Sequence, residues 1–464
     1  MRKIIALALG GTFALGAAGC GDFLKGPGIT ENPNSPTAAT LAQLFIAMQA
    51  NQEMLMESQL ARNTSIYTQQ LIGSNNQQLA YATQYLMTEQ DINNQWNGFF
   101  VGGGLIDLHK IEAQAHAAGD AQWEGITKVW EAFSIGTAAS IWGDVPFREA
   151  AADNATPHLD PQQQVYGDVQ KLLDDAITLL KGTGPGPGSY DLIYSGNTAR
   201  WTAAAYTLKA RFYLHLVERQ GATAYQSALT AAQNGIGEAP TSAANAMDGQ
   251  GPGDFKAFHG STINDGNLWG QFLTARPDIV AGQTLVALLV SRNDPRLARY
   301  FDPAVAGPPA VYRGADRNNV PVGGSPSSTV NKNIHMAYTY RQPYVTWAEN
   351  QLILAEAKFM TGDAAGALVN LNNERTSVGL AALPGPITLQ DVMLEKYIAQ
   401  YQNIDVWADY KRTCFPAVTP GGTAAEVPGR MPYGANERVS NPNIPLPSAA
   451  PTRNWDDPNA CPKP

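Results

Sequence analysis

Paired amphipathic segments joined by glycine turns are the feature that most limits what this chain can fold into. The clearest segment spans residues 160–180, where Val165, Val169 and Leu173 share one apolar face and charged residues occupy the other. Several segments stop at a glycine, and the next one begins directly afterwards. These glycines are Gly119, Gly221 and Gly362. The pattern predicts antiparallel helical hairpins.

Similar periodicity places helices along most of the chain. A first helix is expected from residue 37 onward, and the others are expected at residues 93–118 with a break at 102–104, 121–141, 199–219, 222–236, 344–360, 363–375 and 389–411. Small residues such as Gly136 would let neighbouring helices approach closely. Repeated units of this kind favour tetratricopeptide-like stacking, so the sequence predicts a mostly helical fold.

Long stretches without an apolar period separate these helices. They are rich in Gly, Pro, Asn and Ser, carry aromatic residues, and lie at residues 181–197, 237–276, 301–334 and 415–464. Loops of this length are uncommon in a compact domain unless they bind something. The glycines of residues 182–188 alternate with prolines and follow a helix, so we interpret that stretch as a linker and not as a phosphate-binding loop.

The first twenty residues have the composition of an export signal. Arg2 and Lys3 precede an apolar run at residues 4–18, and small residues lead directly into Cys20. The run is too short to span a membrane, which takes about 20 residues. A cysteine at this place resembles the lipobox of bacterial lipoproteins, which implies cleavage before Cys20 and acylation of its thiol and new amino terminus. Plain secretion is the alternative.

These observations suggest a division of the chain and a compartment. Residues 1–19 would be the signal peptide, residues 20–36 a lipidated tether, and residues 37–464 a single domain with an irregular tail from 415. The formal net charge of -9 argues against a nucleic-acid partner, whose phosphates attract Lys and Arg. In an exported chain Cys414 and Cys461 could form a disulfide, worth roughly 3–5 kcal/mol, or stay as free thiols.

Motifs for catalysis or metal binding are absent from the sequence. His109 and His116 could share a helical face but lack the spacing of a metal site. Asp144 and Glu149 are the nearest carboxylates for an enzyme, yet turn or ion-pair roles explain them better. Residues 407–412 resemble a helix end, where the cations favour the negative end of the helix dipole. No cofactor, metal or catalytic residue is therefore expected.

Several ordered motifs together resemble the SusD/RagB family of outer-membrane nutrient-binding lipoproteins. They are Cys20-Gly21-Asp22-Phe23-Leu24, Asn32-Pro33-Asn34-Ser35-Pro36, Trp142-Gly143-Asp144-Val145-Pro146-Phe147, Asp191 to Trp201, Asn293-Asp294-Pro295-Arg296-Leu297, Leu354-Ala355-Glu356-Ala357, Trp407-Ala408-Asp409 and Arg430-Met431-Pro432-Tyr433. The resemblance covers most of the chain.

The resemblance implies a fold and a role. The fold would be a mostly α, right-handed superhelix of tetratricopeptide-like hairpins that supports long irregular loops. Proteins of this family are not enzymes. They lie at the outer membrane, facing the exterior, as a lid over a SusC-like TonB-dependent transporter, and they capture oligosaccharides or other nutrients. The family builds its pocket from variable loops, so the motif residues would not be ligand contacts.

Candidate contacts must then come from the residues themselves. Sugar rings stack on exposed aromatic faces, and amide or charged side chains bind their hydroxyls. Aromatic residues with such neighbours occur in helix ends and irregular segments. The candidates are Tyr81, Trp96, Asn97, Asn267, Trp269, Phe272, Tyr312 and Arg313.

Two other functions are compatible with the same sequence features. One is an exported helical glycoside hydrolase or lyase, which would also need stacking aromatics together with a carboxylate pair. The other is a tetratricopeptide-type adaptor that binds a peptide in a helical groove. Release of product from a glycan would identify the enzyme, and depletion without cleavage would identify a binding protein.

Overall fold

The computed structural model describes residues 39–150, 154–422 and 424–462. The predicted signal peptide, Cys20 and tether lie outside these residues. By its contacts the chain divides into two units, Met1–Leu44 and Phe45–Pro464. The second unit contains almost all of the described elements. Within the described residues, no helix combines the length and apolar character needed to cross a membrane.

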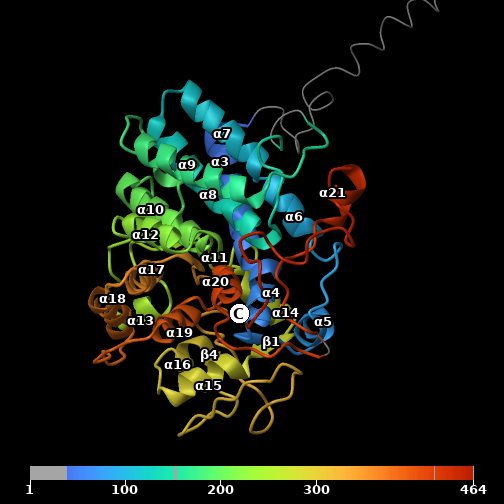
Figure 1. Cartoon of the computed structure of the whole chain (residues 1–464), viewed down its shortest axis with the longest axis vertical. Coiled ribbons are helices and arrows are strands. Elements are labelled where there is room, and N and C mark those ends of the chain that lie inside the picture. The colour runs from blue at the N-terminus through green and yellow to red at the C-terminus, as the bar shows by residue number, and fades with distance from the viewer. Residues whose placement is uncertain (1–38, 151–153, 423, 463–464) are drawn as a thin grey trace, which may run out of the picture. The chain divides into compact units, whose positions relative to one another are not determined.

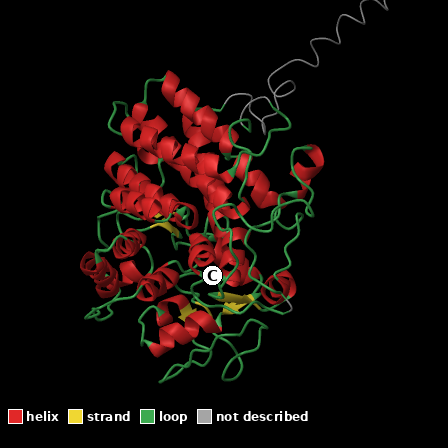
Figure 2. Ribbon diagram, in the orientation of Figure 1, coloured by secondary structure: helices red, strands yellow, loops and turns green. Residues whose placement is uncertain are grey.

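Helices supply most of the ordered structure (Figures 1 and 2). In the first half they are α3 Leu41–Glu57, α4 Gln59–Tyr67, α5 Asn76–Gln84, α6 Asn93–Phe100, α7 Leu105–Ala117, α8 Ala121–Trp142, α9 Gln162–Leu179, η1 Gly188–Tyr190, α10 Thr198–Leu214, α11 Val217–Gln220 and α12 Ala222–Ala232. In the second half they are α13 Ala243–Met247, α14 Leu268–Ala275, α15 Gln283–Ser291, α16 Leu297–Tyr300, α17 Trp347–Met360, α18 Ala364–Ser377, α19 Leu389–Ala399, α20 Asp405–Thr413 and α21 Ala435–Ser440.

The strands are short and form antiparallel pairs. They are β1 Leu71–Gly73, β2 Phe255–Lys256, β3 Ile279–Ala281, β4 Phe301–Asp302, β5 Thr329–Val330 and β6 Pro343–Val345. β1 pairs with β3, β2 with β6, and β4 with β5. Each pair joins segments that are distant in the sequence, so the strands fasten irregular segments together and do not form a core sheet.

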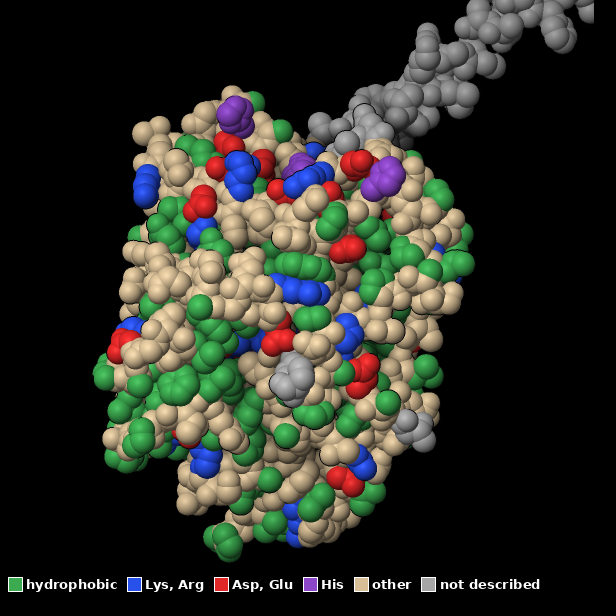
Figure 3. Space-filling view, viewed as in Figure 1, with side chains coloured by type: hydrophobic (Ala, Val, Ile, Leu, Met, Phe, Trp, Pro, Cys, Tyr) green, Lys and Arg blue, Asp and Glu red, His purple; other side chains and the backbone are tan. Residues whose placement is uncertain are grey.

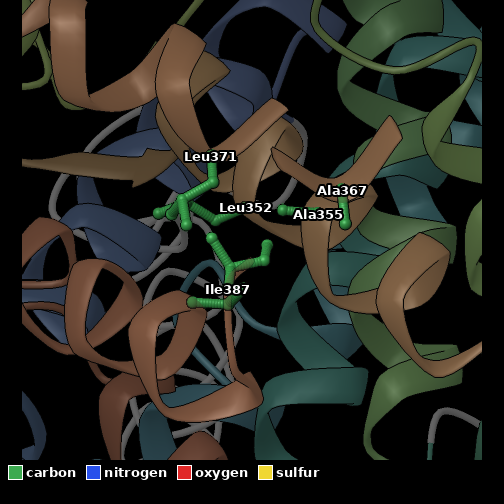
Figure 4. Packing of buried hydrophobic residues seen from close by; sticks show 6 residues of the cluster. Leu352, Ala355, Ala367, Leu371 and Ile387 are labelled. Carbon is green, nitrogen blue, oxygen red and sulfur yellow. The ribbon is translucent and has the colours of Figure 1, made fainter. Parts of the chain in front are cut away.

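The helices pack as successive hairpins (Figure 1). α8 packs against α7 and α9, α10 against α12, and α17 against α18, while α9 contacts α10 and α12 contacts α17. Gly136 on α8 permits one close approach, because a Cβ atom there would lie 2.4 Å from the ring of Phe212 on α10. The α17–α18 contact is filled by aliphatic side chains (Figure 4), namely Leu352, Ala355, Ala367, Leu371, Ile387 and Val392. The predicted mostly helical fold is confirmed.

Polar side chains fix where these helices begin. Asp120 accepts a hydrogen bond from the Trp123 amide at 3.0 Å, and Asn197 accepts one from the Arg200 amide at 3.1 Å. Thr346 opens α17 with a capping box. Such caps satisfy amides that have no partner within the helix. They place the helix starts close to the turns that the glycines predict.

Three predicted helices differ from the structure. The expected helix at residues 199–219 is divided into α10 and α11. The other two are changed by distant partners. Residues 343–345 form β6, because Val345 pairs with Phe255 of β2, and the helix starts only at Trp347. The expected helix at residues 389–411 is interrupted between α19 and α20, where Gln402 has a φ of 63° and its amide bonds the Gln70 side chain. In both places a partner far away in the sequence overrides the local helical pattern.

The tail packs back onto the helical body. Cys414 and Cys461 are joined by a disulfide. The Trp142 indole N–H donates to the Pro432 carbonyl at 2.8 Å, and the Tyr433 hydroxyl donates to the Asp144 carbonyl at 3.2 Å. The end of α8 and residues 430–433 are both motifs of the family resemblance, so these motifs bind each other and leave no exposed ring for a ligand.

Candidate functional site

The most prominent aromatic candidates from the sequence lie in the core. Trp96 and Trp269 are 0% exposed and Tyr81 is 1% exposed. Trp96 meets the rings of Trp142 and Tyr433 edge to face, with centroids 5.2 and 5.3 Å apart. A buried ring offers no face for a sugar to stack on, so the prediction that these three side chains contact a ligand is wrong for this structure.

Asn267 is likewise a structural residue. It is 0% exposed, its side chain accepts from the Trp269 amide at 2.9 Å, and it donates to the His335 carbonyl at 2.7 Å. These bonds cap the start of α14. The amide that we expected to bind sugar hydroxyls instead positions the helix.

Four predicted residues retain some surface. Asn97 on α6, Phe272 on α14, and Tyr312 and Arg313 in the loop between β4 and β5 are half-buried. The ring of Phe272 is covered on one face by the guanidinium of Arg62, whose Cζ atom lies 4.0 Å from the ring centroid. Asn97 lies on a different part of the molecule from the other three, because α6 packs against α21 of the tail.

The structure brings three of the irregular stretches together around the β1–β3 pair. The Ala281 amide donates to the Ser328 carbonyl at 2.9 Å, Asn319 donates to the Ser74 carbonyl at 3.0 Å, and Gln69 donates to the Thr419 carbonyl at 2.7 Å. Residues 268–281, 311–330 and 415–422 thereby form one region, which we call the loop face. Phe272, Tyr312 and Arg313 all belong to it.

Sequence reasoning missed the aromatic residue beside the loop face with the largest exposed fraction. Phe258 is 47% exposed, Ile263 is 54% exposed, and Tyr338 is half-buried against Gly266. Asn264 and Asp265 are exposed next to them. The place of Phe258 and Ile263 in the irregular stretch 237–276 was the available signal, but Trp269 in that stretch was the more obvious candidate.

The segment that carries Phe258 is fixed to α3. The Phe258 amide donates to Glu53 Oε1 at 2.9 Å. Glu57 is bonded by the His259 ring and accepts from the Tyr344 hydroxyl, each at 2.9 Å. Burial raises the pKa of Glu53 to about 8, and the charge of Glu57 adds to the rise. A largely protonated Glu53 can lie beside Glu57 at neutral pH, so this acid pair anchors a loop.

Three hollows among the residues that the structure describes differ in size and lining. An internal cavity lined by Phe133, Arg211 and Tyr344 measures ≈ 20 Å³, enough for about one water molecule. A surface groove of ≈ 350 Å³ contains the Arg200–Glu238 ion pair, and a second of ≈ 270 Å³ lies along the tail beside Arg430. Neither groove presents an exposed ring.

Charged side chains and possible metal ligands are spread over the part of the chain that the structure describes. Figure 3 shows Lys, Arg, Asp and Glu side chains interspersed on the visible face, with no stripe of one sign. Among the described residues, no group of three His, Cys, Asp or Glu side chains could hold a metal ion. His109 bonds Glu131 at 2.8 Å and His116 bonds Glu124 at 3.1 Å, so the two histidines do not converge.

Comparison with known proteins identifies a family and a shared fold. A family model named SusD-like, described as starch-binding associating with outer membrane, matches residues 33–434. No curated protein sequence matches the chain.

Solved structures with the same fold cover almost the whole chain. A chitin-binding protein has a TM-score of 0.75 at 20% identity, covering 90% of this chain and 100% of its own. A SusD/RagB family protein from Bacteroides thetaiotaomicron has a TM-score of 0.70 at 21% identity, covering 91% and 100%. A chitin-binding SusD homolog from Flavobacterium johnsoniae has a TM-score of 0.70 at 18% identity, covering 90% and 99%. At these identities the likeness concerns the fold.

Proposed function

The chain belongs to the SusD-like family, a non-catalytic glycan-binding family associated with the outer membrane, and we propose that it is a lipid-anchored protein of the cell exterior that delivers a glycan to a SusC-like TonB-dependent transporter. The match of the family model over residues 33–434 carries this proposal. The glycoside hydrolase or lyase considered from the sequence disagrees with membership of a non-catalytic family. Residues 1–19 act as the signal, 20–36 as the tether, and 37–464 as one binding domain.

The ligand that we propose is an oligosaccharide held beside the loop face, at the segment that carries Phe258. The family description names starch, and two of the similar structures are described as chitin-binding. Phe258 and Tyr338 supply apolar ring surface, and Asn264 and Asp265 supply polar groups beside it. Rings of this kind stack on the C–H faces of sugars while amides and carboxylates bind hydroxyls.

Co-purification tests the transporter partnership. The native protein is extracted from outer membranes in mild detergent, captured through an affinity tag, and its partners are identified by mass spectrometry. We expect a large TonB-dependent barrel in near-stoichiometric amount. Recovery of the protein without any such barrel, at a detergent concentration that preserves other outer-membrane complexes, would contradict the partnership.

Cys20→Ser is expected to release the protein from membranes. The acyl chains on Cys20 are the proposed anchor, and two or three buried chains are needed for lasting attachment. Fractionation of cells that express each form should place the wild type in the outer-membrane pellet and the variant in the soluble fraction. Equal membrane retention of the variant would rule out the lipid as the anchor. Cys461→Ser serves as the control, because the sulfur of Cys461 forms a disulfide with Cys414 in the folded body and cannot carry a lipid.

Phe258→Ala is expected to weaken glycan binding by about 2- to 10-fold, since an aromatic stacking contact contributes about 0.5–1.5 kcal/mol. The measurement is isothermal titration with the best glycan from a panel, together with chromatography to show that the glycan is not cleaved. Tyr190→Ala is the matched control, because Tyr190 is also 47% exposed but lies on the α8 side, stacked near Trp123. Equal losses in both variants would exclude a specific role for Phe258.

A further inference from the structure

Arg62 on α4 is a buried arginine without a carboxylate partner among the residues that the structure describes. It is 9% exposed, and its Nε atom is buried with no hydrogen-bond partner. The other buried arginines of this part of the chain are Arg211, Arg296 and Arg412, and each of them pairs with at least two carboxylates. Arg62 departs from the rule that buried charges are compensated.

An aromatic ring and a second cation lie close to Arg62. Its guanidinium stacks on Phe272 at 4.0 Å, which covers one face of the cation and leaves its N–H edge uncovered by that ring. Burial lowers the pKa of Arg62 to about 10, Tyr81 opposes this, and the nearby cation Arg276 lowers the pKa further. Arg62 is still protonated at neutral pH. Arg276 itself is exposed at the end of α14.

We propose that Arg62 and Arg276, beside Phe272, form a subsite for an oxyanion on the glycan, either the carboxylate of a uronic acid or a sulfate ester. This inference rests on the proposed function and narrows its substrate class. A buried unpaired cation is costly, so a ligand that supplies the missing negative charge gains more there than at a solvated surface. A guanidinium carries parallel N–H donors that match the geometry of a carboxylate or sulfate.

A neutral sugar would not satisfy the same site. A hydroxyl can accept a hydrogen bond from a guanidinium, but it leaves the charge of Arg62 uncompensated. Phe272, one of the aromatic residues that the sequence suggested for stacking, already has one face covered by the guanidinium. The subsite therefore favours an acidic glycan over a neutral one.

The test compares four tetrasaccharides by isothermal titration against the folded mature protein. Tetragalacturonate carries only carboxylates, a carrageenan tetrasaccharide carries only sulfates, and maltotetraose and chitotetraose are neutral. We expect at least one acidic tetrasaccharide to bind, and to bind more weakly as NaCl rises from 50 to 500 mM. Arg62→Met should reduce that affinity about 10- to 100-fold, as loss of charge-assisted hydrogen bonds predicts. Arg276→Gln should reduce it less, and Arg148→Met, an exposed arginine paired with Asp168, should leave it unchanged.

Thermal unfolding without ligand gives a second readout. If Arg62 binds a ligand and does not stabilise the fold, Arg62→Met should have a Tm equal to or above that of the wild type, because an uncompensated charge is removed. Arg211→Met, which breaks a buried ion pair with Glu349, should lower Tm. A fall in Tm for Arg62→Met as large as for Arg211→Met would assign Arg62 a structural role and overturn the subsite.

Two binding outcomes would also overturn the inference. If only the neutral tetrasaccharides bind, the anion subsite is wrong while the proposed glycan-binding function stands. If an acidic tetrasaccharide binds Arg62→Met and wild type equally, the acidic group is recognised elsewhere. Failure of the proposed function would show differently, as absence of the transporter from the co-purified proteins.

Discussion

Arg296→Met is expected to lower the free energy of unfolding by about 3–5 kcal/mol, the cost of leaving buried charges without their partner. Arg296 is 1% exposed and donates to Asp294 at 2.9 Å, to Glu374 at 3.0 Å and to Glu395 at 2.7 Å. Arg292 and Arg375 also bond Glu395. Methionine fills a similar volume but removes the cation that pairs with Glu374. Asp294 keeps only the more distant Arg292, at 3.8 Å.

Urea denaturation at several pH values measures this effect and separates it from a packing defect. Burial raises the pKa of Glu374 to about 8 even with Arg296 present. Without Arg296 the clustered acids hold their protons to higher pH, so the folded variant binds more protons than its unfolded chain, and its stability falls as pH rises. The deficit should therefore be larger at pH 8 than at pH 5.

Arg200→Met is the control for this experiment. Arg200 forms a two-bond ion pair with Glu238 at 2.9 Å, but the two side chains are 35% and 48% exposed. Exposed pairs contribute only about 0–1 kcal/mol. A deficit for Arg296→Met that is as small as that of Arg200→Met, or that does not change with pH, would mean that the buried cluster does not stabilise the fold.

Local signals account for the parts of the fold that the sequence predicted. The helices at residues 121–141 and 363–375 match α8 and α18 closely, because an apolar face, a capping aspartate and a flanking glycine all lie within a few residues of one another. The start of α17 was misplaced, since pairing of Val345 with Phe255 depends on a segment about ninety residues away in the chain. Elements set by distant partners were the ones that periodicity could not locate.

The candidate site was harder to predict because an amide side chain next to an aromatic residue can either bind a ligand or cap a helix. Asn267 next to Trp269 was interpreted as a sugar-binding pair, yet the same amide caps α14 and the indole is buried. Phe258 has the exposed ring, and nothing in the sequence distinguishes it from other loop aromatics. Only the fold shows which rings face solvent.

Buried charge pairing occurs in or next to two of the described motifs that carry the family resemblance, at Arg296 and at Arg412. Lys411 and Arg412 were expected to act as cations at a helix end, but they are 2% and 5% exposed. Lys411 donates to the Ser140 carbonyl at 2.7 Å, and Arg412 donates to Glu356 at 2.7 Å. Arg296 lies in another of these motifs. In these two described motifs the charged side chains hold helices and loops in place.

Glu356→Gln is expected to be the second strongly destabilising change, with the opposite dependence on pH. Glu356 on α17 is 0% exposed and bonds Lys396 of α19 at 3.0 Å as well as Arg412 of α20. Both cations also bond Asp409, at 2.9 Å from Lys396 and at 2.8 Å from Arg412. This one carboxylate therefore links three helices.

The pKa of Glu356 fixes the pH range of the effect. Burial would raise this pKa, but the charges of Arg412 and Lys396 outweigh burial and lower the pKa to about 2. An acid whose pKa is lower in the folded state stabilises the fold above its unfolded pKa, near 4.5, and loses that contribution as pH falls toward 2. A shift of this size corresponds to about 3 kcal/mol at neutral pH.

Urea denaturation of wild type and Glu356→Gln between pH 7 and pH 3 tests this expectation, with Glu238→Gln as the exposed control. The difference in unfolding free energy should be about 3 kcal/mol at pH 7 and should shrink below pH 4.5, because Glu356 in the unfolded wild-type chain then takes up a proton while the folded state keeps its charge until the pH approaches 2. Arg296→Met removes a cation and should lose stability as pH rises, whereas Glu356→Gln removes an anion and should approach the wild type as pH falls. Urea denaturation measures both trends. A loss of unfolding free energy that does not change with pH in either variant would show that lost packing, and not unpaired charge, causes that loss.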